Sequence, residues 1–389
     1  MNKLFSISLI IIFICILILP MVFVNISGGE ISKQENRMLA SRPSLELAFE
    51  WPSEFIRNFN DWFNDNIGFR EKIISFYQKL NIISSRDQYK DGQYIMLIGQ
   101  NGHHYFADVD GNLIPKFQGK DFLTNEQLVD FTNGLNKIKL FLDNKEIPLI
   151  VMFCADKESI YPEFYPRSIV RGPEPIQLDI ITNYILEHTD IDIFNIKECL
   201  INEKNNYPVF DKDGDAIFIL THYNEIGAFF AYRELIKHVN YYMPDIKAFT
   251  IDDIEIKYAE KLASNGKIYK DIPDVNLIKN INYFKDDSDI FTVVNIDQPS
   301  QGIVFKNSDI FLPKILIMHD SYTGTGNFIS RYIPQQFSET VLIHWANMRY
   351  LTEYIEKFNP DIIVFESAER MLGSFSLIII DAIKNGSFN

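Results

Sequence analysis

Cysteine is scarce in this sequence, since its 389 residues include only Cys15, Cys154 and Cys199. Three cysteines form neither a disulfide framework nor a recognisable metal-binding motif. Cys154 ends an apolar run and is predicted to be a small buried side chain, while a Cys154–Cys199 disulfide in an oxidising compartment stays open as an alternative. The seven histidines also lack H-E-x-x-H or a comparable ligand spacing. The sequence therefore predicts no metal and no cofactor.

Basic residues are outnumbered as well, with 37 Lys and Arg against 52 Asp and Glu and a formal net charge of -15 at pH 7. Such a chain offers no basic stripe that could displace the counterions of a nucleic acid. Internal repeats and low-complexity tracts are also absent. The 47% hydrophobic and 14% aromatic content is typical of a folded protein. We therefore predict a folded protein with no nucleic-acid partner.

One apolar run is long enough to cross a membrane. Leu4 to Val24 is an almost unbroken apolar stretch of about 21 residues, and roughly 20 helical residues span the hydrocarbon core of a bilayer. A signal-peptide core is shorter, about 7–15 residues, and the sequence after this run is a poor match to a cleavage site. We predict an uncleaved anchor over residues 1–26, with a cleaved signal peptide as the alternative. In both cases the folded part lies outside the cytoplasm, in the periplasm or outside the cell, and the anchored form crosses the cell membrane once.

The next residues, 27–90, are predicted to form a helical lead-in. Apolar residues recur at helical spacing from Ser53 to Ser85, with an interruption near Asn66 to Phe69, so two helices are expected there. Residues 91–389 are then predicted to form one catalytic domain.

Strands and helices alternate through this predicted domain. Continuous apolar runs indicate strands covered on both faces, and amphipathic segments indicate the helices between them. The alternation predicts a three-layer α/β/α fold with a parallel sheet and right-handed crossovers. Residues 245–313 interrupt it with short strand-like pieces and are predicted as an insertion. The expected elements are a hairpin of Tyr94–Ile98 and His104–Phe106, strands at Pro148–Phe153, Ile191–Phe194, Ile315–Met318, Thr340–His344 and Asp361–Phe365, and helices at Asn125–Asn144, Ile176–His188, Ile226–Val239, Asn327–Phe337 and Met348–Phe358.

Ser321 is the best candidate for a nucleophile. It lies just past the strand Ile315–Met318, with Gly324 and Gly326 in the turn behind it. Ligands and nucleophiles lie at the carboxyl ends of strands in open α/β sheets, because side chains there leave the packed core. A serine on such a turn also has backbone N–H groups nearby that can hold an oxyanion. The alternative is that Asp320 and Ser321 only cap the next helix, since both residue types are favoured at N-caps.

A serine nucleophile needs a base within hydrogen-bond reach, and His222 is the best placed by sequence. It follows the apolar run Ala216–Leu220 and precedes a helix that Asn224 is expected to cap. The bland alternative is a partly exposed histidine in a turn. His319 and His344 are rivals for the base, because each ends a predicted strand of the same sheet.

Several segments together are similar to those of the alginate O-acetyltransferase family of AlgX and AlgJ. Two lie in the lead-in: Glu35–Pro43 reads E-N-R-M-L-A-S-R-P and Asp65–Arg70 reads D-N-I-G-F-R. The others, in chain order, are Ala155–Pro162 (A-D-K-E-S-I-Y-P), Leu220–Ala228 (L-T-H-Y-N-E-I-G-A), His319–Tyr322 (H-D-S-Y), and Pro360–Asp361 with Glu366 and Glu369–Arg370. The resemblance covers most of the chain outside residues 245–302.

This resemblance implies an SGNH-hydrolase-like catalytic domain that transfers acetyl groups. It assigns Ser321 as the nucleophile, His222 as its general base and the backbone N–H of Tyr322 as an oxyanion donor. The sequence departs from the family at Leu220, where the family has the aspartate that orients the histidine, a loss that can cost about 10⁴ in rate. Glu225, three residues after His222, is the nearest stand-in for that acid. Asp213 and Asp215 are poorer substitutes if residues 216–220 form a strand.

Three functions follow as alternatives. The first is an anchored O-acetyltransferase acting on an exopolysaccharide or another cell-surface glycan, with a membrane-bound O-acyltransferase as the partner that supplies the acyl group. The second is a carbohydrate esterase of the same fold. The third is a catalytically degraded glycan-binding or assembly subunit, which the leucine at position 220 favours. Tyr322, Tyr223 and Trp345 are candidate sugar-stacking faces, although core packing is the favoured role for each.

Overall fold

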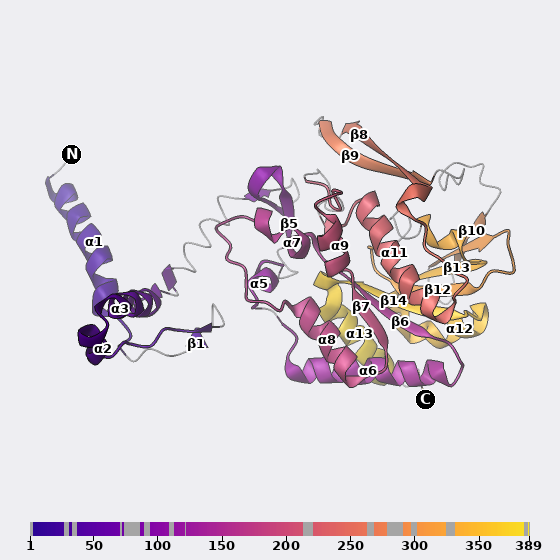
Figure 1. The fold of residues 1–389 in the computed structure, drawn as a ribbon, viewed down its shortest axis with the longest axis horizontal. Coiled ribbons are helices and arrows are strands. Elements are labelled where there is room, and N and C mark those ends of the chain that lie inside the picture. The colour runs from indigo at the N-terminus through magenta and orange to yellow at the C-terminus, as the bar shows by residue number, and fades with distance from the viewer. Residues whose placement is uncertain are drawn as a thin grey trace. The chain divides into compact units, whose positions relative to one another are not determined.

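The computed structural model shows a mixed α/β protein (Figure 1). It describes residues 3–26, 31–32, 37–70, 72–73, 86–88, 94–108, 113–120, 122–212, 221–262, 268–277, 291–296, 302–323, 331–384 and 388. The chain divides into two compact units. The first consists of residues 1–86, 114–121 and 167–174, and the second of residues 87–113, 122–166 and 175–389.

Helices dominate the described part of the first unit. It contains α1 (Lys3–Val22), β1 (Ile31–Ser32), β2 (Arg37–Met38), α2 (Leu45–Glu50) and α3 (Pro52–Asn66). The first of the two helices expected between Ser53 and Ser85 is thus present, and most of the second lies outside the described residues. No helix among the residues described is long and apolar enough to cross a membrane, so the predicted anchor has no support from the structure.

The two lead-in segments that carry the family resemblance contact each other. The backbone N–H of Ala40 donates to the Asp65 carboxylate at 2.9 Å, and the Asn66 side chain donates to the Ala40 carbonyl at 2.9 Å. The Asn66 side chain also donates to the Trp62 carbonyl within α3. These motif residues therefore act within the first unit as structural ties.

A seven-stranded sheet organises the second unit. Its strands are β6 (Leu149–Cys154), β7 (Asp192–Asn195), β10 (Phe291–Ile296), β11 (Gly302–Asn307), β12 (Lys314–His319), β13 (Glu339–His344) and β14 (Ile362–Ala368). The strand order is β10-β11-β13-β12-β14-β6-β7, and the strands from β13 to β7 are parallel. Every residue of β6 and of β14 is buried, as expected for parallel strands covered on both faces.

Helices cover both faces of this sheet, which confirms the predicted α/β layers (Figure 1). The helices are α6 (Asn125–Asp143), α8 (Gln177–His188), α9 (Lys197–Glu203), α11 (Glu225–Tyr242), α12 (Leu351–Phe358) and α13 (Leu372–Lys384). α6 and α13 pack together through an edge-to-face contact of Phe131 and Phe375, whose ring centroids are 5.7 Å apart. α9 and α11 lie together on the opposite face.

The remaining α-helices and strands of the described residues lie outside the main sheet. They are α5 (Leu113–Phe117), α7 (Lys157–Ile160), the sheet of β3 (Arg86–Gln88), β4 (Tyr94–Ile98) and β5 (His104–Asp108), and the antiparallel ribbon of β8 (Ile254–Leu262) and β9 (Ile268–Leu277). β4 and β5 pair antiparallel in the predicted hairpin.

The region predicted as an insertion contributes to the main sheet. β10 and β11 fall within or beside residues 245–313 and pair antiparallel at one edge of the sheet. β11 buries Val304 and Phe305 because it pairs with β13. The sequence misses this edge because no helix separates β10 from β11, so the strand–helix alternation that identifies the parallel strands is missing.

The predicted helix Asn327–Phe337 is wrong over its described part. Residues 324–330, including Gly324 and Gly326, lie outside the described residues. Residues 331–337 contain only a 3₁₀ turn, η5 (Ile333–Gln335). Pro334 lacks the N–H that an α-helix interior needs and restricts the residue before it. Another 3₁₀ segment, η6 (Trp345–Tyr350), precedes α12, which therefore begins later than predicted.

Candidate active site

Ser321 lies on a turn at the carboxyl end of β12, a central strand of the sheet. The last residue of β12, His319, is paired with His344 at the end of β13. Ser321 is exposed, whereas its neighbours Asp320 and Tyr322 are buried. The fold therefore presents the serine hydroxyl at the surface and anchors the turn on both sides of it.

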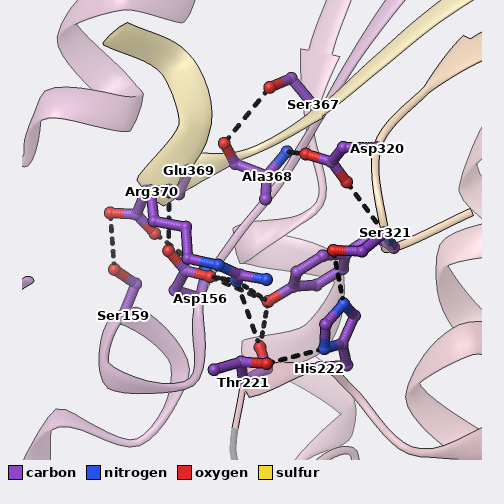
Figure 2. Close-up of polar contacts among 11 residues, drawn as sticks. Asp156, Ser159, Thr221, His222, Asp320, Ser321, Ser367, Ala368, Glu369 and Arg370 are labelled. Carbon is purple, nitrogen blue, oxygen red and sulfur yellow. Dashed lines mark hydrogen bonds and ion pairs between the residues drawn. The ribbon is translucent and has the colours of Figure 1, made fainter. Parts of the chain in front are cut away.

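Asp320 holds this turn in place with its own side chain. One carboxylate oxygen accepts a hydrogen bond from the backbone N–H of Tyr322 at 2.9 Å, as in an Asx turn. The other accepts from the N–H of Ala368 at the end of β14, at 2.7 Å (Figure 2). The N–H of Asp320 in turn donates to the Glu366 carboxyl at 3.1 Å. Asp320 thus ties the turn to the neighbouring strand, and the alternative helix cap lies in part outside the described residues.

The structure brings His222 to Ser321, as the sequence predicts. His222 Nε2 lies 2.8 Å from Ser321 Oγ, although the two residues are 99 positions apart (Figure 2). Asn224 caps α11 as expected, because its side-chain oxygen accepts from the N–H groups of Ile226 and Gly227, both at 3.1 Å. Gly227 lets this helix start close to the preceding chain, since a Cβ there would lie 2.3 Å from the Val209 carbonyl. The start of α11 thereby fixes where His222 can lie.

Thr221 contacts the other nitrogen of the His222 ring. Its Oγ1 lies 2.7 Å from His222 Nδ1 (Figure 2). For Nε2 to accept a proton from Ser321, a neutral imidazole must carry its own proton on Nδ1. The threonine oxygen is then the acceptor, a role that its hydroxyl can take, so the contact is compatible with the tautomer that can act as a base.

Glu225, the predicted supporting acid, contacts residues other than His222. Its carboxylate instead accepts from the N–H of Val275 at 2.7 Å and forms an ion pair with Arg331 at 2.9 Å. Glu225 is the first residue of α11, so its side chain points to the neighbouring β8–β9 ribbon. Sequence spacing alone could not decide this direction. Leu220, Asp213 and Asp215 lie outside the described residues, so their predicted roles stay predictions.

The backbone N–H of Tyr322 is also placed differently from its predicted role as an oxyanion donor. It already donates to the Asp320 carboxylate at 2.9 Å. The sequence prediction considered only that this N–H follows the nucleophile, and the Asx turn removes it from that use. The Tyr322 ring, like those of Tyr223 and Trp345, is buried, so core packing is the role of all three aromatic residues.

The rival histidines are engaged elsewhere. His319 Nδ1 lies 2.5 Å from the Asp320 carbonyl, and burial lowers the pKa of His319 to about 4. His344 accepts a hydrogen bond from the N–H of Ala346 at 3.1 Å and so caps the start of η6. Neither ring therefore takes the position that His222 holds beside Ser321.

Buried charge surrounds this pair of residues. Burial raises the pKa of Glu366 well above its ordinary range, and the Asp320 carboxylate raises it further. Burial opposes the charge of Arg370, but the attraction of Asp156 outweighs it and raises the Arg370 pKa. Burial and then Asp156 raise the pKa of Glu369 to about 7. These shifts favour a neutral Glu366, and the charged Arg370 forms an ion pair with Asp156.

Three residues of the site carry no role in the sequence prediction: Thr221, Asp156 and Arg370. Asp156 and Arg370 are within segments that resemble the family, directly after the adjacent strands β6 and β14. Charged residues just past buried strands are a signal that could have identified both. For Thr221 the only signal is that a hydroxyl residue directly precedes the candidate base.

No protein-family model matches this chain, and no curated protein matches its sequence. Solved structures match its fold. PatB1 of Bacillus cereus has a TM-score of 0.50 and 15% identity, covering 72% of this chain and 97% of PatB1. A DHHW family protein from Eubacterium siraeum has a TM-score of 0.48 and 13% identity, covering 77% of this chain and 97% of that protein. The O-acetyltransferase domain of Pseudomonas putida AlgJ has a TM-score of 0.44 and 12% identity, covering 74% of this chain and 99% of that domain.

The likeness to PatB1 concerns the fold, a mixed α/β architecture, and extends over almost the whole length of PatB1. In this mixed α/β fold with a mostly parallel sheet, an exposed serine lies beside a histidine, the pairing that a serine nucleophile and its base require.

Proposed function

We propose that this protein is an extracytoplasmic O-acetyltransferase that acetylates an exopolysaccharide or another cell-surface glycan through an acyl-serine intermediate. The observation that carries the proposal is the 2.8 Å contact between Oγ of the exposed Ser321 and Nε2 of His222. This is the hydrogen-bond geometry that general-base activation of a serine requires.

The reaction follows from this geometry in two steps. In the first, Ser321 Oγ attacks the carbonyl carbon of the acyl donor, its proton passes to His222 Nε2, and the bond from the acyl carbon to the donor breaks. The imidazolium returns that proton to the leaving group. In the second, a glycan hydroxyl attacks the acyl-serine ester, its proton passes to His222 and then to Ser321 Oγ, and the acetylated glycan leaves.

The donor and the location are parts of the same proposal. A membrane-bound O-acyltransferase is the partner that would supply the acyl group, as the family resemblance implies. The apolar run from Leu4 to Val24 supports an extracytoplasmic location with a single-pass attachment to the cell membrane.

The same serine chemistry gives an esterase when water replaces the glycan hydroxyl. The acceptor of the acyl group therefore distinguishes an acetyltransferase from an esterase. A degraded subunit has no need of a serine within hydrogen-bond reach of an oriented histidine. The geometry therefore favours an enzyme over that third reading.

The test is acyl transfer from p-nitrophenyl acetate by the full-length protein in detergent. Ser321→Ala should lower kcat about 10³-fold or more, after subtraction of the uncatalysed rate. Intact-protein mass spectrometry should find an acetyl adduct on the wild type and none on this variant. Ser376→Ala is the control, because it removes a serine hydroxyl that donates to the Gly373 carbonyl at 2.8 Å in α13, away from the site.

Equal rates for the wild type and Ser321→Ala would overturn both enzyme readings. A second assay offers oligosaccharides as acceptors and measures the acetylated product against free acetate. Transfer to a sugar supports the acetyltransferase, while release of acetate alone at every acceptor concentration would favour the esterase.

A further inference from the structure

Two turns that are distant in sequence are joined by more than the contact between Ser321 and His222. The Tyr322 hydroxyl donates to the Thr221 backbone carbonyl at 2.5 Å. The Tyr223 hydroxyl donates to the Tyr322 carbonyl at 3.1 Å. The neighbours of the candidate base and of the candidate nucleophile are therefore hydrogen-bonded to each other. Any movement of Thr221 relative to Tyr322 would change the distance from Ser321 to His222.

Arg370 and Asp156 both contact the Tyr322 hydroxyl of this connection (Figure 2). Arg370 donates from its backbone N–H to the Asp156 carboxylate at 2.8 Å and forms an ion pair with the same carboxylate through its guanidinium. The guanidinium also donates to the Tyr322 hydroxyl oxygen at 3.2 Å and approaches the Thr221 carbonyl at 3.4 Å. Asp156 is 3% exposed, so the ion pair is shielded from solvent.

The single proton of the Tyr322 hydroxyl has two nearby acceptors, Asp156 at 2.9 Å and the Thr221 carbonyl at 2.5 Å. Arg370 already donates twice to Asp156, which satisfies much of the carboxylate's need for donors. We therefore assign the proton to the Thr221 carbonyl. A guanidinium that donates to the phenol oxygen makes the phenol a stronger donor, because hydrogen bonds in a chain polarise one another.

We propose that Tyr322 and Arg370 are positioning residues for the base, holding the Thr221 peptide so that the Thr221 hydroxyl meets His222 Nδ1 and His222 Nε2 meets Ser321. Asp156 keeps Arg370 in place. The inference rests on the proposed acyl-serine function, to which it adds the residues that orient the histidine. The polar groups of Tyr322 and Arg370 act through Thr221, while the Tyr322 ring also packs against the His222 ring, with centroids 4.5 Å apart.

Tyr322→Phe in the full-length protein tests this role, because it removes the hydroxyl and leaves the ring in its packing. We expect kcat for p-nitrophenyl acetate to fall about 10- to 100-fold with KM unchanged, since small misplacements of a catalytic group cost rates of this size. Inactivation by phenylmethylsulfonyl fluoride, which labels an activated serine, should slow by a similar factor.

Tyr105→Phe is the matched control. The Tyr105 hydroxyl is also buried and also donates to a backbone carbonyl, that of Tyr161, at 2.6 Å. Its loss should lower the thermal unfolding midpoint about as much as Tyr322→Phe does while leaving kcat and the labelling rate unchanged. Equal kcat values for Tyr322→Phe and Tyr105→Phe would reduce the Tyr322 hydroxyl to a structural role and overturn the inference.

Arg370→Lys and Arg370→Met form a second pair. Lysine keeps a charge for Asp156 and a donor, so it should recover part of the kcat that methionine loses, and equal losses would contradict the role of Arg370.

The ¹⁵N shifts of the His222 ring give a readout that does not depend on turnover. The wild type should show the Nδ1–H tautomer and Tyr322→Phe a mixture of both tautomers. If the tautomer is unchanged in Tyr322→Phe, the positioning role is overturned and the proposed function is not. If the wild type neither turns over p-nitrophenyl acetate nor reacts with phenylmethylsulfonyl fluoride, the proposed function is overturned.

Discussion

The two halves of the candidate site are held in different ways. The nucleophile turn is held by Asp320, a residue of the turn itself, which bonds to Tyr322 two residues on and to the adjacent strand β14. The histidine segment is held by side chains from two other parts of the chain, Tyr322 and Arg370, which meet the Thr221 carbonyl. The serine turn therefore carries its own connection to the sheet, whereas the position of the histidine depends on side chains from elsewhere in the chain.

Because the two halves are held differently, substitutions in them should have different effects on folding and on catalysis. A change at Asp320 removes hydrogen bonds from the turn and from the sheet together, so it should affect both folding and catalysis. A change around Thr221 should affect the histidine with little effect on the sheet. Four substitutions test this difference between the two halves.

Asp320→Asn should have the largest effect. Both carboxylate oxygens accept from buried backbone N–H groups, and an amide can accept only one of these bonds. We expect a loss of about 1–3 kcal/mol in the free energy of unfolding and a fall in kcat of about 100-fold or more. Urea unfolding and esterase kinetics measure the two. Asp361→Asn is the control, because Asp361 accepts from the N–H of Lys314 at 2.7 Å at the other, exposed end of β12. Equal activity losses in the two variants would contradict the special role of the turn.

Thr221→Val should come next, because it removes the hydroxyl beside His222 Nδ1 and keeps the shape of the side chain. We expect kcat to fall about 10-fold, the cost of one hydrogen bond of about 1.4 kcal/mol in the transition state. Thr221→Ser should restore most of the rate. Thr182→Val is the control, since it removes another buried hydroxyl, which donates to the Leu178 carbonyl at 2.7 Å in α8. If Thr221→Val keeps wild-type kinetics, Thr221 does not orient the histidine.

A substitution of Glu369 tests whether the carboxyl that contacts Asp156 makes the stability of the protein depend on pH. Its carboxylate accepts from the Asp156 N–H at 3.0 Å and from the Ser159 hydroxyl at 2.9 Å, and its pKa rises from 4.5 to about 7. A carboxyl with a raised folded pKa stabilises the fold fully below its unfolded pKa, and this contribution is lost as the pH rises through its folded pKa. Wild-type stability should therefore fall between these two pH values.

Urea midpoints measured across this range should fall less for Glu369→Gln than for the wild type, because glutamine does not ionise. Glu187→Gln, at an exposed position of α8, should leave the wild-type pH profile unchanged. The same pH profile for the wild type and Glu369→Gln would show that Glu369 does not carry the effect.

Glu225→Gln should have the smallest effect on the reaction. The variant loses the ion pair with Arg331 and keeps an acceptor for the Val275 N–H. We expect kcat within about twofold of the wild type and a loss of about 1 kcal/mol or less in the free energy of unfolding, as for a partly exposed ion pair. A drop in kcat as large as that of Thr221→Val would restore the carboxylate of Glu225 as the acid that supports His222.

Much of the fold could be predicted because parallel strands and their helices leave local patterns. The hairpin, the strands β6, β7, β12, β13 and β14, and the helices α6, α8 and α11 lie close to where apolar runs and periodicity place them. Strand β11 could not be placed, because its pairing with β13 is set by the sheet and leaves no local pattern in the sequence. The helix predicted at 327–337 failed in its described part because apolar spacing took no account of Pro334.

The sequence by itself determined that Ser321 follows a buried strand and that His222 precedes a capped helix, since both are properties of neighbouring residues. Only the tertiary structure decided what surrounds them. Packing placed Glu225 beside Arg331, and it brought Asp156 to Tyr322 across 166 positions and to Arg370 across 214. The physical reason is that a buried donor or acceptor must find a partner wherever packing places one, and sequence distance does not enter that choice.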